Sequence, residues 1–245
     1  MKAALQMVYP PQCLGCGASV AGLEGGGVAL CPDCWRETRF ITGAACGRCG
    51  VPLPDDGTGI ADTGLICDDC LQIDRPWRHG RAAVVYAGTG RRLALALKHH
   101  DRPDMAPHLA GWLAQAAAPV IRPDMVVAPV PLHLFRLMRR RYNQAALLSA
   151  PLARAWRLPH MPDLLIRTRH TPAQGFGDRD SRFANQEGAM SVNPRRLAAI
   201  EGRAVLLIDD VMASGATLAQ AAGVLLDAGA GPISVAVLAR AVKDD

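Results

Sequence analysis

After residue 76 the chain alternates between short runs of consecutive apolar residues and stretches in which apolar residues recur every three or four positions. Continuous runs are typical of strands buried on both faces of a parallel sheet, and the periodic stretches are typical of helices that cover such a sheet. The pattern predicts strands at 82–87, 125–130, 205–208 and 233–238, and helices at 91–98, at 105–117, from near Asn143 and from near Thr217. We therefore expect an α/β fold with a parallel sheet and flanking helices.

The most informative stretch is VLLIDDVMASGATL, from Val205 to Leu218. An apolar run ends in Asp209 and Asp210, and a short turn with Ser214 and Gly215 leads into the last helix. Free amides and the positive end of a helix favour a phosphate, and Ser214 and Thr217 add hydroxyl donors. Adjacent carboxylates accept hydrogen bonds from a sugar diol and can engage Mg²⁺. The stretch predicts a site for a phosphorylated ribose; the plainer alternative is a buried strand followed by solvated acids.

Two further stretches supply positive charge. After the strand at 125–130 come four arginines, and the polar segment that follows Leu164 has no apolar period. In an open sheet, ligands bind at the carboxyl ends of the strands, which is where these residues would lie. Solvated faces and a disordered loop are the alternatives. The candidate nucleic-acid contacts are Arg136, Arg139, Arg140, Arg141, Arg167, Arg169 and Arg182.

All eight cysteines precede residue 71 and form four pairs of identical CxxC spacing. A disulfide framework is the competing interpretation, but the chain starts without a recognisable secretory leader, which favours zinc. The simplest arrangement is two successive four-cysteine sites, and a crossed pairing of the CxxC units is the alternative. All-cysteine ligation indicates structural Zn²⁺ rather than catalytic Zn²⁺. The two predicted zinc sites are Cys13, Cys16, Cys31 and Cys34, and Cys46, Cys49, Cys67 and Cys70.

Charge divides the chain at the same place. Residues 1–76 hold five Lys/Arg and nine Asp/Glu, so with a total of +5 the rest of the chain carries +9. We therefore predict a zinc-binding module at 1–76 and a basic domain at 77–245 whose partner is anionic. The sequence has no apolar run near the roughly 20 residues of a membrane helix, so we expect a cytoplasmic protein without membrane insertion.

These pieces resemble the ComF family of competence-associated, phosphoribosyltransferase-like proteins. The resemblance rests on the cysteine pairs with CPDCW at Cys31, VPLH at Val130, YNQA at Tyr142, RTRHTPAQ at Arg167 and DDVMASGATL at Asp209. It implies a double zinc-ribbon module followed by a type I phosphoribosyltransferase-like domain. It also implies phosphoribosyl pyrophosphate with Mg²⁺ as ligand, and single-stranded DNA and a DNA-processing protein as partners during natural transformation.

The resemblance also implies roles for individual residues. Asp209 and Asp210 would hold the ribose hydroxyls, and the segment 167–185 would close over the site. The 5-phosphate would lie on the loop residues Ala213, Ser214, Gly215, Ala216 and Thr217. The pyrophosphate would lie near Val130, Pro131, Leu132 and His133.

Two residues depart from the family pattern. Ala213 stands where most relatives have threonine and purine-salvage enzymes have a catalytic aspartate, so this side chain can accept no proton. Arg141 stands where the family often has glycine, which costs backbone freedom and adds a cation. Two functions follow as hypotheses: transfer of a phosphoribosyl group to a nitrogen nucleophile, or non-catalytic binding of single-stranded DNA or of a protein partner on the same fold.

Overall fold

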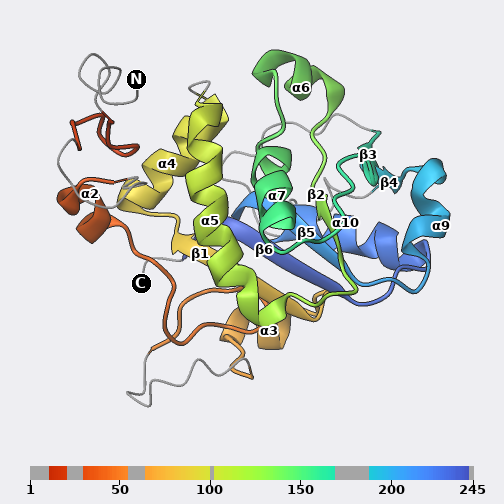
Figure 1. The fold of residues 1–245 in the computed structure, drawn as a ribbon. Coiled ribbons are helices and arrows are strands. Elements are labelled where there is room, and N and C mark those ends of the chain that lie inside the picture. The colour runs from red at the N-terminus through yellow and green to blue at the C-terminus, as the bar shows by residue number, and fades with distance from the viewer. Residues whose placement is uncertain (1–10, 21–29, 55–63, 100–101, 169–187, 243–245) are drawn as a thin grey trace.

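The centre of the molecule is a four-stranded parallel sheet (Figure 1). The structure, a computed structural model, describes residues 11–20, 30–54, 64–99, 102–168 and 188–242. The strands lie in the order β1-β6-β5-β2. They are β1 (His79–Val85), β2 (Val126–Pro129), β5 (Val205–Met212) and β6 (Ile233–Arg240). The predicted parallel sheet is confirmed, with all four strands near their predicted positions.

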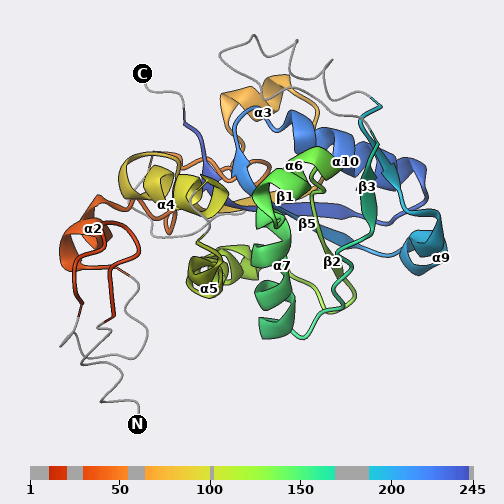
Figure 2. The same ribbon diagram turned by 90° about the horizontal axis from the view of Figure 1, so that it is seen from above.

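Helices cover both faces of this sheet (Figure 2). One face packs against α4, α5 and α7, and the opposite face packs against α10. The longer helices are α4 (Gly88–His99), α5 (Ala106–Ala117), α6 (Leu134–Arg140), α7 (Gln144–Ala155) and α10 (Ala216–Asp227). The short elements are α2 (Pro32–Glu37), α3 (Asp68–Gln72), α9 (Leu197–Ile200) and the 3-10 turns Pro103–Met105, Ala118–Val120 and Pro194–Arg196. The sheet is therefore the middle layer of three.

Strand β5 is twice as long as predicted, because its pairing with β6 continues through the two acids as far as Met212 opposite Arg240. Its pairing with β2 ends earlier, at Pro129 opposite Ile208. Beyond Ile208 the β2 side of β5 is therefore open, and the two carboxylates lie where this opening begins. Every residue of β6 is buried, as expected for a central strand with apolar side chains on both faces.

Two short elements were not predicted. The start of the polar segment after Leu164 forms β3 (Leu165–Arg167), which pairs antiparallel with β4 (Met190–Val192), and the predicted loop over 169–187 lies outside the described residues. The arginine-rich stretch before Asn143 was given no element of its own, yet it forms α6. Short strands and one-turn or two-turn helices leave little periodicity in a sequence, which is why both were missed.

The N-terminal part packs against the sheet instead of forming a separate body. Phe40 and Ile41, which link the two cysteine-rich segments, lie beside the edge strand β1, and the amide of Ile41 donates to the carbonyl of Ala83 at 2.9 Å. Phe40 also forms an aromatic cluster with Trp35 and Trp112 of α5, with ring centroids 4.6 and 5.1 Å from its own. These three rings line a cavity of about 730 Å³.

In the part of the chain that the structure describes, none of the helices has the length and apolar character that a bilayer crossing needs.

Candidate functional site

The two acids predicted to hold a sugar lie side by side on β5. One oxygen of Asp209 accepts a hydrogen bond from the amide of Asp210 at 2.9 Å, and one oxygen of Asp210 accepts from the amide of Val211 at 2.9 Å. Burial and then the charge of Asp210 raise the pKa of the Asp209 carboxyl well above its usual range. Hard carboxylate oxygens are the donors that Mg²⁺ prefers, so this pair fits the ion.

The loop after β5 and the start of α10 form a hollow of about 210 Å³. Asp209 lines this hollow, whereas Asp210 is not among its lining residues. Ala213, Ser214, Gly215, Ala216 and Thr217 line the rest of it with Val211, Met212 and Leu218. A space of this size is smaller than the roughly 300–1,000 Å³ of pockets for drug-sized ligands, so it fits a phosphate with part of its sugar.

Gly215 gives the loop its turn. Its φ of +85° lies in the left-handed region, and it immediately precedes the first residue of α10. The first residues of α10, Ala216 and Thr217, line the hollow, and the dipole at a helix N-terminus favours negative charge there. The Ser214 hydroxyl accepts from the amide of Ala216 at 3.4 Å. The structure thus brings Asp209 together with the loop that the sequence suggested, whereas Asp210 does not line the hollow.

The VPLH segment lies next to β5. The amide of Val130 donates to the carbonyl of Ile208 at 2.9 Å, and the side-chain amide of Asn143 donates to the carbonyl of Val130 at 2.9 Å. Pro131 and Leu132 continue the segment to His133, whose ring accepts from the amide of Phe135 and begins α6. Asn143 also caps α7 by accepting from the amide of Ala145 at 3.0 Å. The Asn143 of the YNQA motif therefore connects two elements.

The basic residues gather on the same side. Burial lowers the pKa of Arg167, the positive charge of Arg136 lowers it further, and Asp209 acts in the opposite direction. Burial and the charge of Arg140 likewise lower the pKa of Arg136. Arg140 donates to the side chain of Gln144 at 3.4 Å. Three of the predicted cations therefore lie near one another, and the charge of Asp209 acts on one of them, Arg167.

The remaining predicted cations divide into two groups. Arg141 is exposed and has a φ of +64°, in the left-handed region, just after α6. Arg169 and Arg182 lie outside the described residues, as does the side chain of Arg139.

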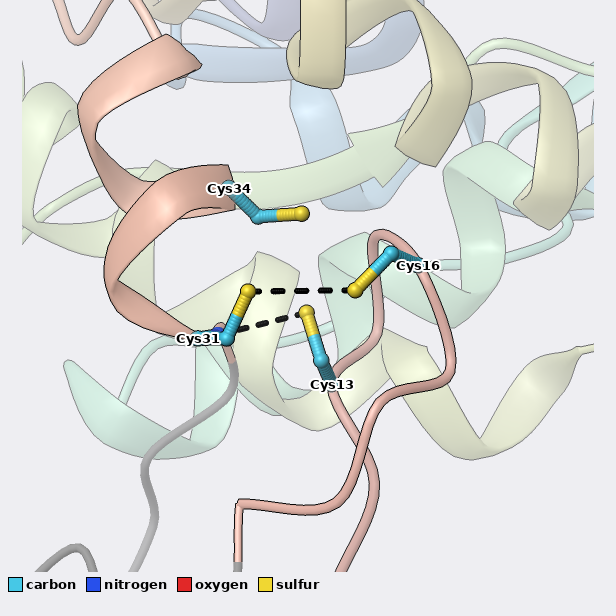
Figure 3. Close-up of side chains that lie close together, drawn as sticks. All are labelled: Cys13, Cys16, Cys31 and Cys34. Atoms are coloured by element: carbon cyan, nitrogen blue, oxygen red, sulfur yellow. Dashed lines mark hydrogen bonds between the residues drawn. The ribbon is translucent and has the colours of Figure 1, made fainter.

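The cysteines form the two predicted tetrads and not the crossed arrangement. In each tetrad the four sulfurs lie within 4.8 Å of one another. The Sγ atoms of Cys16 and Cys31 are 3.8 Å apart (Figure 3), and those of Cys49 and Cys67 are 3.6 Å apart. A tetrahedral Zn²⁺ with bonds of about 2.3 Å places its sulfurs about 3.8 Å apart, so both tetrads fit the ion.

Three residues that the sequence did not single out lie at the site. Lys98, at the end of α4, acts on Asp209 by lowering the pKa of its carboxyl. Arg75 and Arg240 are both buried and donate to the loop between β5 and α10. A signal for Arg240 exists in the sequence, because it is the first cation after the largely apolar run at 233–239.

Comparisons with known proteins agree with this geometry. Residues 4–71 match the model of the double zinc ribbon domain, and residues 171–244 match that of the phosphoribosyl transferase domain. The chain is 30% identical over 219 residues to Competence protein F of Haemophilus influenzae, with 86% of this chain and 90% of that protein covered. The chain belongs to the ComF family.

Other ComF relatives and folds are similar to this chain. The DNA utilization protein YhgH of Escherichia coli K12 is 31% identical over 217 residues, with 86% of this chain and 90% of that protein covered. Among solved structures, a glutamine phosphoribosylpyrophosphate amidotransferase from B. subtilis is 20% identical with a TM-score of 0.39, over 58% of this chain and 30% of that one. The predicted family and fold class are confirmed, and the boundary between residues 76 and 77 stays a prediction.

Proposed function

We propose that the hollow at the end of β5 binds phosphoribosyl pyrophosphate together with Mg²⁺. The observation that carries this proposal is that Asp209 lines the same hollow as the loop and the N-terminus of α10. A carboxylate and a set of free amides in one small space match a sugar diol and a phosphate. The phosphoribosyl transferase domain match covers this segment and supports the assignment.

In this proposal each part of the ligand meets a different element. The 5-phosphate lies on the loop residues Ala213 to Thr217, and the ribose hydroxyls meet Asp209 and Asp210. The pyrophosphate extends toward the segment 130–133 and the cations of Arg136 and Arg167. Mg²⁺ would be held by the carboxylates and would neutralise part of the pyrophosphate charge.

Ala213 limits the chemistry of the loop. Its methyl group is exposed and can accept no proton. The loop can therefore bind and orient a phosphoribosyl group, and a proton that leaves an acceptor nitrogen during transfer has to go to a group outside the loop. Binding is the part of the function that this geometry supports best.

Calorimetry with phosphoribosyl pyrophosphate and Mg²⁺ tests the proposal. We expect saturable binding by the wild-type chain and its loss in the double variant Asp209→Asn with Asp210→Asn. The matched control is Asp227→Asn, an exposed acid at the far end of α10. A folded double variant that binds as tightly as the wild type would contradict the proposal.

We propose single-stranded DNA as a second ligand, on the exposed side of α6. Phe135 is 69% exposed, its ring centroid lies 5.3 Å from that of His133, and Arg136 and Arg140 lie on the same short helix. An exposed aromatic ring beside cations is suited to stack a base and to hold its backbone. The names of the ComF relatives, which refer to competence and to DNA utilization, support a role of this kind.

The salt dependence of DNA affinity tests this second proposal. The triple variant Arg139→Ala, Arg140→Ala and Arg141→Ala is expected to flatten the slope of affinity against salt concentration, because fewer phosphate contacts release fewer counterions. The Asp209 and Asp210 double variant serves as the control that keeps DNA binding. An unchanged slope in the triple variant would remove these arginines from the interface.

A further inference from the structure

We infer that Arg75 and Arg240 are positioning residues that make the phosphate-binding loop depend on the second cysteine tetrad, an inference that rests on the proposed function of that loop. Arg75 follows the last cysteine of this tetrad by five residues. Its Nε donates to the sulfur of Cys70 at 3.1 Å, and its Nη1 donates to the carbonyl of Ser214 at 3.0 Å. One guanidinium thus connects a metal-binding sulfur with the loop.

Arg240 makes the same kind of connection from the other side of the loop. Its Nη2 donates to the sulfur of Cys49 at 3.8 Å, and its Nη1 donates to the carbonyls of Met212 at 3.1 Å and Ala213 at 2.8 Å. Arg240 comes from the end of β6, whereas Arg75 comes from the segment before β1. Two arginines far apart in the chain therefore converge on one tetrad and one loop.

Both guanidiniums are buried, since Arg75 and Arg240 are each only 4% exposed. A buried cation needs a compensating charge. Four cysteine thiolates with one Zn²⁺ carry a net charge of −2, so the second tetrad supplies negative charge that compensates Arg75 and Arg240. Arginine has five N–H groups in a rigid fork, so each guanidinium can donate to a cysteine sulfur and to the loop carbonyls at the same time.

The loop is also shaped to admit Arg75. A side chain at Gly215 would collide with Nη1 of Arg75 and would lie 3.3 Å from the ring of Trp77. The guanidinium of Arg75 stacks over the Trp77 ring at 5.2 Å, and the Trp77 indole donates to the carbonyl of Arg48 at 2.6 Å. Gly215 is therefore needed for the fit of Arg75 as well as for its positive φ.

The first tetrad has no such connection among the described residues. Its neighbouring arginine, Arg92, donates to the sulfur of Cys34 at 3.9 Å, and its other hydrogen bonds go to the side chains of Glu37 and Thr89. In our inference, Zn²⁺ in the second tetrad holds its four sulfurs in place, and two of these sulfurs accept hydrogen bonds from Arg75 and Arg240. The two guanidiniums in turn hold three consecutive carbonyls of the loop. Loss of that Zn²⁺ releases the loop, whereas loss of the first Zn²⁺ leaves it in place.

The test compares Arg75→Gln and Arg240→Gln with the matched control Arg92→Gln. We expect the first two variants to lose affinity for phosphoribosyl pyrophosphate with Mg²⁺ by at least about tenfold, since each loses hydrogen bonds from a charged donor. Arg92→Gln is expected to bind like the wild type. The zinc content of each purified chain, expected to stay at one ion per tetrad, shows whether the tetrads are intact. If Arg75→Gln or Arg240→Gln keeps both zinc ions and binds phosphoribosyl pyrophosphate as tightly as the wild type, the inference is overturned.

Hydrogen exchange separates this inference from the proposed function. Amides of residues 212–218 are expected to exchange faster in Arg75→Gln and Arg240→Gln than in Arg92→Gln, whether or not the wild type binds the ligand. If the wild type fails to bind but exchange responds as described, the ligand is wrong and the coupling holds. If Arg75→Gln does not fold, Arg75→Lys replaces it, because lysine keeps the charge but cannot donate to the sulfur and the loop carbonyl in the same way. Unchanged amide exchange of residues 212–218 in that variant would count against the inference.

Discussion

Asp209, which we propose as a ligand-binding residue, lowers the stability of the folded chain when it is ionised. Burial and the adjacent Asp210 raise the pKa of its carboxyl well above the usual range. A raised pKa in the folded state means that ionisation of this group opposes folding, and that the opposition grows as the pH rises from the ordinary carboxyl range to the folded pKa. Below the unfolded pKa the group is protonated in both states and the cost vanishes.

Asp209→Asn is therefore expected to stabilise the chain while it abolishes ligand binding. We expect the free energy of unfolding at pH 8 to rise, and the gain to shrink as the pH is lowered into the ordinary carboxyl range. Urea denaturation in the presence of zinc across this pH range measures both effects. Asp227→Asn is the control, and an equal gain at every pH would contradict the assignment of a raised pKa to Asp209.

Arg141 is strained in a different way, because a φ of +64° is unfavourable for a residue with a side chain. Arg141→Gly is expected to raise the free energy of unfolding by about 0.5–1 kcal/mol, since glycine adopts this backbone geometry without strain. Thermal denaturation measures the change. The control Arg154→Gly, at an exposed position inside α7, is expected to destabilise by about 1 kcal/mol, and a loss of stability in both variants would contradict the prediction.

At the scale of elements, helices and strands were predicted best from the sequence where a regular apolar pattern marks their buried residues. The four sheet strands and the helices α5, α7 and α10 carry long apolar patterns, and all were predicted near their observed positions. The extension of β5 through Asp209 and Asp210 was missed, because the strand was predicted from its apolar run and two acidic residues interrupt that run. The pairing with β6, which continues to Arg240, keeps this part of β5 extended.

In the candidate site, too, some residues could be predicted from the sequence and others could not. The cysteine tetrads and the acids with their loop were predicted, because each is a local motif whose spacing carries its chemistry. Arg75, Arg240 and Lys98 were not predicted, because they reach the site from other parts of the chain. A contact such as that between Arg75 and Ser214 depends on tertiary structure, and one sequence holds no local pattern for it.

Asn143 offers a test at the junction of two elements. It caps α7 with its side-chain oxygen and holds the VPLH segment with its side-chain nitrogen. Asn143→Ala is expected to lower the free energy of unfolding by about 1–2 kcal/mol, because both hydrogen bonds are lost.

Asn143→Asp keeps the cap and loses the donor to the carbonyl of Val130, so it should lose less stability than the alanine variant. Chemical denaturation of both variants measures the difference. Equal losses would mean that the contact with Val130 contributes most of the effect.

At the scale of the whole molecule, the two predicted domains share their cores. Cys13 and Cys34 pack with one face of the sheet, and Cys46, Cys49 and Trp77 pack with the other. The tetrads therefore act as parts of two hydrophobic layers. The sheet domain relies on the cysteine-rich segment to cover the edge of β1 and the ring of Trp77.

A fragment of residues 77–245 alone is expected to be much less stable than the full chain. It would expose the edge of β1 and the face on which the second tetrad packs, and exposed strand edges favour aggregation. Size-exclusion chromatography and thermal unfolding of the fragment and the full chain make the comparison. A monomeric fragment with the melting temperature of the full chain would show that the cores are independent.

The aromatic rings at the two tetrads have a practical consequence for experiments. Trp35 and Trp112 lie against Phe40 near the first tetrad, whereas Trp77 is stacked under a guanidinium at the second. Emission from an indole depends on its immediate surroundings, so stepwise withdrawal of metal should change the fluorescence of different tryptophans in turn. Native fluorescence, followed with Trp77→Phe as a spectral blank, can therefore report which ion leaves first without any attached dye.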